Sequence, residues 1–146
     1  MAEFRHAIEI AAPIDVVFAH LVTPAGLTSW IGTAAIVDPR PGGDFALTIA
    51  GNAIRGHYLV VDSPHRVVIS WGVEGNDALP PGASRVSFTL TPTATGTQVE
   101  LVHSGLPAPL LAGHADGWFH FAARWVMAAT GNQLDTDRWV PLPQRR

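Results

Sequence analysis

His103 is the side chain in this sequence best placed to perform acid–base chemistry. It alternates with Val99 and Leu101 along an expected strand, so all three side chains should point into the same apolar layer. A histidine there could anchor a polar group of a ligand or transfer protons near neutral pH. The alternative is a structural role, with the ring buried and hydrogen-bonded to Ser104 or to a backbone carbonyl. The pattern leaves both roles open.

Aromatic side chains could form the walls of an apolar pocket in the same layer. Ligand sites are mostly apolar with a few polar groups, and the inward positions of this chain are nearly all Val, Leu, Ile, Phe and Trp. The alternative is that these side chains simply fill the core. The residues predicted to bind a ligand are Trp30, Ile49, Trp71, Phe88, His103, Trp118, Phe121 and Trp125.

Other kinds of site find little support in the sequence. Asp116 and His120 lie four residues apart on an expected helix, where they can pair on its surface, and we predict no catalytic role for them. The other histidines lack the spacing of metal ligands, so we expect neither a metal nor a cofactor. There is no serine elbow, phosphate-binding glycine loop or dinucleotide fingerprint. The sequence has no cysteine, which excludes thiol chemistry.

Composition sets the class of protein. A chain of 146 residues fits one domain, which we expect over residues 1–131, with a tail over 132–146. The formal charge is −3, and the nine basic residues are all arginines scattered along the chain, which argues against a nucleic-acid partner. No apolar run is long enough to span a membrane, and the first residues do not resemble a signal peptide. We therefore expect a cytoplasmic protein with no membrane partner.

One long helix is expected over residues 113–131. Trp118, Phe121 and Trp125 recur at helical spacing and predict one apolar stripe along it. Gly131 follows as a residue that can adopt the left-handed conformation which ends helices.

Most of the preceding chain alternates like a sheet. Pro13 and Thr23-Pro24 are typical starts for two short helices after the first strand. Short turns between the later strands predict antiparallel neighbours. The fold class is therefore α+β, with a curved antiparallel sheet around the C-terminal helix. The expected strands are residues 4–10, 34–38, 44–50, 54–61, 66–73, 84–92 and 98–104.

Five segments in this order resemble a known family. They are AAPIDVVFAHLVTPAGLTSWIG, VDPRPGGDFAL, GHYLVVDSPHRVVISW, GTQVELVHSGL and DGW, and the resemblance that they carry covers roughly residues 4–131. Through these segments the chain resembles the activator of Hsp90 ATPase homologue (AHSA1-like) family. That family belongs to the START/Bet v 1-like superfamily, whose helix-grip fold matches the order of elements above.

The resemblance implies a small hydrophobic or aromatic ligand held between the sheet and the last helix. Because the inward positions are apolar, we favour binding over catalysis. The alternatives are a polyketide cyclase or aromatase-like enzyme that uses His103, and an Hsp90-type co-chaperone module. The founding co-chaperone has an additional N-terminal domain, whereas this chain starts directly at the first strand, which argues against a chaperone partner. A homodimer stays open.

Overall fold

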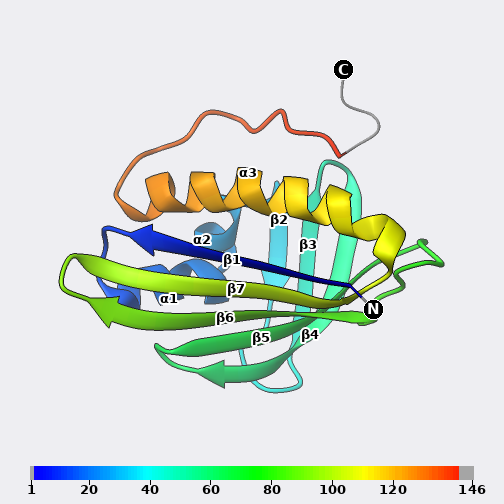
Figure 1. The fold of residues 1–146 in the computed structure, drawn as a ribbon, viewed down its shortest axis with the longest axis horizontal. Helices are drawn as coiled ribbons and strands as arrows, with labels where there is room; N and C mark the ends of the chain where they lie inside the picture. Colours follow the sequence, from blue (N-terminus) through cyan, green and yellow to red (C-terminus); the bar gives the residue numbers. More distant parts are fainter. Residues whose placement is uncertain (1, 142–146) are drawn as a thin grey trace.

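A seven-stranded antiparallel sheet curves around the long C-terminal helix α3 in the computed structural model, which describes residues 2–141 (Figure 1). The sheet order is β1-β7-β6-β5-β4-β3-β2, so the first and last strands of the chain are neighbours. The predicted α+β helix-grip architecture is confirmed. The strands are β1 Ala2–Ile10, β2 Ala34–Val37, β3 Asp44–Ile49, β4 Asn52–Asp62, β5 Arg66–Val73, β6 Ser84–Thr93 and β7 Gly96–Leu106.

Helix α3 spans Leu111–Ala129 and directly follows a short 3-10 helix, Ala108–Leu110. The helix therefore begins two residues before the predicted start at 113, and it ends two residues before the predicted end at 131. Gly131 has a φ of +93°, the left-handed conformation expected just beyond a helix end. The predicted stripe is the buried face of the helix, which includes Trp118, Phe121, Ala122, Trp125 and Ala129.

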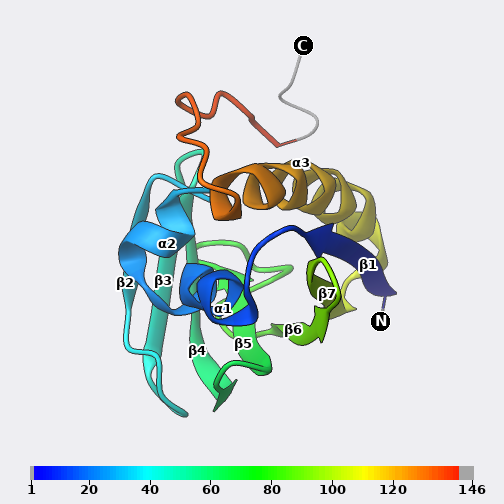
Figure 2. The same ribbon diagram turned by 90° about the vertical axis from the view of Figure 1, so that its left-hand side faces the viewer.

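The two short predicted helices close one end of the curved sheet (Figure 2). They are α1, Ile14–Val22, and α2, Pro24–Thr28. Thr23 caps α2, because its hydroxyl oxygen accepts a hydrogen bond of 3.0 Å from the backbone N–H of Gly26. The buried Tyr58 hydroxyl on β4 donates to the carbonyl of Leu21 at 2.9 Å, which ties the end of α1 to the sheet.

The core lies between the concave face of the sheet and the three helices. Phe45, Ile69, Phe88 and Leu101 are buried there with the apolar face of α3, as the alternation predicts. Ile8 is only half-buried, because β1 is an edge strand of the sheet. None of the helices in residues 2–141 is both long and apolar enough to cross a bilayer.

Candidate functional site

A cavity of about 470 Å³ lies where α3 faces strands β3, β4 and β5. Its volume is within the range typical of small-molecule sites. Its lining is mainly apolar, with Asn52, Asn76 and His114 as polar members, and most of it comes from four parts of the chain. The sheet side contributes Ile49, Ile54, Trp71 and Val73, helix α3 contributes Gly113, His114, Gly117, Trp118 and Phe121, the chain after α2 contributes Ile31, and the C-terminal segment contributes Trp139 and Pro141.

The eight residues predicted to bind a ligand divide into two groups. Ile49, Trp71, Trp118 and Phe121 line the cavity, whereas Trp30, Phe88, His103 and Trp125 do not. All eight are buried. Whether the four lining residues contact a ligand stays a prediction that requires a binding measurement.

Trp30 and Trp125 belong to a packed aromatic cluster in the core. Their rings are stacked, with centroids 4.5 Å apart and planes 12° from parallel. Phe88 meets Trp125 edge-on at 5.7 Å. The indole N–H of Trp30 donates to the carbonyl of His20 at 3.1 Å, so the stacked pair is tied to the end of α1. These rings support the fold rather than the cavity surface.

His103 sits in a chain of hydrogen bonds that uses both nitrogens of its ring. The indole N–H of Trp118 lies 3.0 Å from Nδ1, which must accept because an indole nitrogen can only donate. Nε2 lies 2.8 Å from the Ser84 hydroxyl, which lies 2.7 Å from the carbonyl of Trp71. The Ser84 hydroxyl therefore donates its proton to the carbonyl of Trp71. Nε2 of His103 carries the ring proton and donates it to the Ser84 oxygen. The chain joins β5, β6, β7 and α3 in one network.

This network gives His103 a structural role and a neutral ring. Burial lowers the pKa of His103 to about 3, with a smaller lowering from the neighbouring His114. The predicted hydrogen-bond partners, Ser104 or a backbone carbonyl, were wrong, because the partners of the ring are Ser84 and Trp118. His103 nevertheless acts on the cavity indirectly, since it holds the indole of Trp118, which is part of the lining.

His114 is a polar group of the cavity that the sequence interpretation missed. Its Nδ1 lies 2.9 Å from the carbonyl of Leu110 and must donate, so Nε2 of the neutral ring is an acceptor. Burial lowers the pKa of His114, and the bond to Leu110 acts in the opposite direction. The spacing of His114, Trp118 and Phe121 along one helix face was the signal in the sequence that could have identified it.

Trp71 has a hydrogen-bond donor, whereas His114 has an acceptor. Its indole N–H is buried and has no hydrogen-bond partner in residues 2–141, while its side chain lines the cavity. A buried donor without a partner costs about 1–3 kcal/mol. The Trp125 indole N–H is also without a partner, but Trp125 does not line the cavity. Within the described chain, no group of three metal-binding side chains occurs.

Comparisons with known proteins agree with the fold. The model of the family described as activator of Hsp90 ATPase homolog 1-like protein matches residues 11–126. No curated protein matches the sequence. Among solved structures, the AHSA1-like protein RHE_CH02687 from Rhizobium etli is 34% identical, with a TM-score of 0.72, and the match covers 99% of this chain and 90% of that one.

Two further solved structures share the fold. CalU16 from Micromonospora echinospora is 30% identical, with a TM-score of 0.71, over 88% of this chain and 73% of its own. The Aha1 dimer from Colwellia psychrerythraea is 18% identical, with a TM-score of 0.78, over 88% of this chain and 96% of its own. The last similarity concerns the fold alone.

Proposed function

Because the chain belongs to the family of activator of Hsp90 ATPase homolog 1-like proteins, whose solved members share its fold, we propose that it binds a small aromatic molecule between the sheet and α3. The observation that supports this proposal is the cavity of about 470 Å³, which is lined by Trp71, Trp118 and Phe121. An apolar cavity of this size with few polar groups has the composition of a ligand site.

Two of the polar groups of the lining favour one class of ligand. The Trp71 indole N–H is a donor without a partner in residues 2–141, and the neutral His114 ring has an acceptor at Nε2. A hydroxyl group on a flat aromatic ring can accept one hydrogen bond and donate another. We therefore expect a hydroxylated aromatic compound to bind more tightly than the same ring without the hydroxyl group.

The enzyme alternative that uses His103 has less support from the geometry. A cyclase or aromatase of the kind considered above needs a base that reaches the substrate. His103 does not line the cavity, and both of its ring nitrogens are already hydrogen-bonded.

A homodimer stays a prediction, which native mass spectrometry of the purified protein would test together with any small molecule that co-purifies.

Filling the cavity should abolish binding without unfolding the protein. Gly113 lines the cavity in the first turns of α3, and a Cβ built there meets nothing within 4 Å. We expect 2-naphthol to bind the wild type with a Kd of about 10–100 µM, since a ligand this small gains limited free energy. Gly113→Phe should show no saturable binding by calorimetry. Its thermal stability should be kept, because glycine is a poor helix residue.

Two comparisons make this experiment decisive. Naphthalene should bind about two- to tenfold more weakly than 2-naphthol, because it makes no hydrogen bond. Trp71→Phe keeps the aromatic lining but removes the N–H, and it should reduce that difference. If wild type and Gly113→Phe bind 2-naphthol equally, or if neither binds it, the proposed site is wrong.

A further inference from the structure

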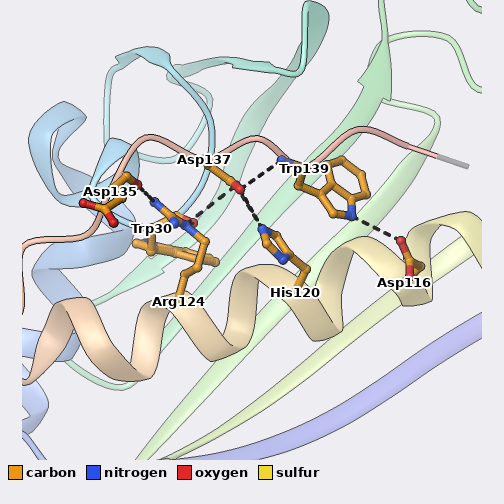
Figure 3. Close-up of polar contacts among 7 residues, drawn as sticks. All are labelled: Trp30, Asp116, His120, Arg124, Asp135, Asp137 and Trp139. Atoms are coloured by element: carbon orange, nitrogen blue, oxygen red, sulfur yellow. Dashed lines mark hydrogen bonds and ion pairs between the residues drawn. The ribbon is translucent and has the colours of Figure 1, made fainter. Parts of the chain in front are cut away.

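The chain after α3 runs back along the outside of the helix, as Figures 1 and 2 show. We call residues 132–141 the strap. The strap contains no helix or strand. Within the described chain, no backbone–backbone hydrogen bond involves residues 133–141, so side chains hold this stretch in place. These contacts come from one face of α3, where Asp116, His120 and Arg124 recur at intervals of four residues (Figure 3).

Asp137 is the main point of attachment. Its carboxylate oxygens lie 2.9 and 3.0 Å from Nε2 of His120, and one of them lies 3.7 Å from Nε of Arg124. The side chains of Asp137 and Arg124 are only 18% and 20% exposed, so solvent weakens this ion pair less than it would at the open surface. Asp137 also accepts a hydrogen bond of 3.1 Å from the backbone N–H of Trp139. One carboxylate therefore fixes both the strap and the position of Trp139.

The side chain of Trp139 packs against α3. Its indole N–H donates to Asp116 at 3.2 Å, and its ring stacks over His120 at 5.9 Å and meets Phe121 at 5.0 Å. Gly117 makes room for it, because a Cβ at that position would come within 3.3 Å of the ring. The Trp139 side chain is half-buried and packs against the core.

The ring of Trp139 is also part of the cavity lining. Trp139 lines the same cavity as Trp71 of β5 and Trp118 of α3, so indoles from three distant parts of the chain surround one space. We propose that Trp139 is a ligand-binding residue that selects among aromatic ligands, and that Asp137 positions it. This inference rests on the proposed function and adds the strap to the site.

The way in which the strap is held gives it a second effect. Because no backbone–backbone hydrogen bond of the described chain involves residues 133–141, the strap can move away without breaking any backbone hydrogen bond of the sheet or of α3. A bound ligand under Trp139 is then released when the strap lifts. Loosening the attachment at Asp137 should therefore speed the release of ligand.

The test compares three variants of the full chain, with 2-naphthol as the probe. Trp139→Ala removes the ring, Asp137→Ala removes the attachment, and Val140→Ala is the matched control, because Val140 is exposed and does not line the cavity. Trp139→Ala should raise the Kd about five- to tenfold, the effect of losing one aromatic contact. Asp137→Ala should raise the rate of ligand release in stopped-flow measurements. Val140→Ala should change neither.

The outcomes separate this inference from the proposed function. If the wild type binds 2-naphthol but Trp139→Ala binds it equally well, the role of Trp139 is wrong and the cavity site stands. If the wild type does not bind 2-naphthol, both proposals fail. Trp139→Phe keeps an aromatic ring and should bind more tightly than Trp139→Ala, and this pair decides the question even if loss of the ring lowers thermal stability. An unchanged release rate in Asp137→Ala would overturn its positioning role.

Discussion

Replacing Trp125 with alanine should lower the free energy of unfolding by about 3–5 kcal/mol, the range for truncating a large buried aromatic residue. The Trp125 side chain is fully buried, stacked on Trp30 and in edge contact with Phe88. Its loss leaves a hole among three elements that cannot all move inward. Urea denaturation followed by circular dichroism measures the change.

Phe119 provides the matched control on the same helix. Its side chain is 53% exposed, and it contacts Phe4 and His6 on the other side of α3. Phe119→Ala should therefore cost clearly less, about 1 kcal/mol. Trp125→Phe should also cost less than Trp125→Ala, because it keeps a ring and removes an N–H that has no partner in the described chain. Equal losses for Trp125→Ala and Phe119→Ala would mean that the stacked pair does not anchor the core.

Acid should destabilise the protein through His103. The pKa of the buried ring is lowered to about 3 from an ordinary value of 6.5. Between these two values His103 is protonated in the unfolded chain but not in the folded protein. The contribution of His103 to stability is complete above pH 6.5 and is lost as the pH falls toward 3. Between these limits the unfolding equilibrium should shift by up to about tenfold per pH unit. At pH 4.5 the loss from this group is about 3 kcal/mol.

His103→Gln separates this effect from the titration of carboxylates. Glutamine can accept from Trp118 and donate to Ser84 but does not titrate. The variant should be less stable than the wild type at pH 7, and its free energy of unfolding should fall less steeply between pH 6.5 and 4.5. The partly buried His114 is present in both proteins, so the effect of its own burial is common to both, and only its coupling to His103 is lost in the variant. Parallel pH profiles would show that the His103 ring is already protonated or solvated in the native state.

The fold could be predicted because its signals are local. Alternation along β3, β6 and β7 places every second side chain in the core, and the spacing of Trp118, Phe121 and Trp125 marks the buried face of α3. These patterns repeat within a few residues and do not depend on how distant elements pack. The order of elements then led to the correct family.

The division of the aromatic residues into core and cavity could not be predicted in this way. Trp118 and Trp125 lie seven residues apart on the same stripe, yet only Trp118 lines the cavity. The difference arises because Trp30, 95 positions before Trp125 in the sequence, fills the space beside Trp125. His103 illustrates the same limit, since its partners Ser84 and Trp118 are 19 and 15 residues away.

The strap has a consequence for how this protein can change over time. A substitution in a central strand must preserve packing and ladder hydrogen bonds, and most such changes destabilise a domain. No backbone–backbone hydrogen bond of the described chain involves residues 133–141, so apart from Asp137 and Trp139 this stretch carries little of that constraint. Mutations there can alter the surroundings of Trp139 at little risk to folding. New ligand preferences can therefore arise in this short stretch while the sheet and the helix keep their sequence.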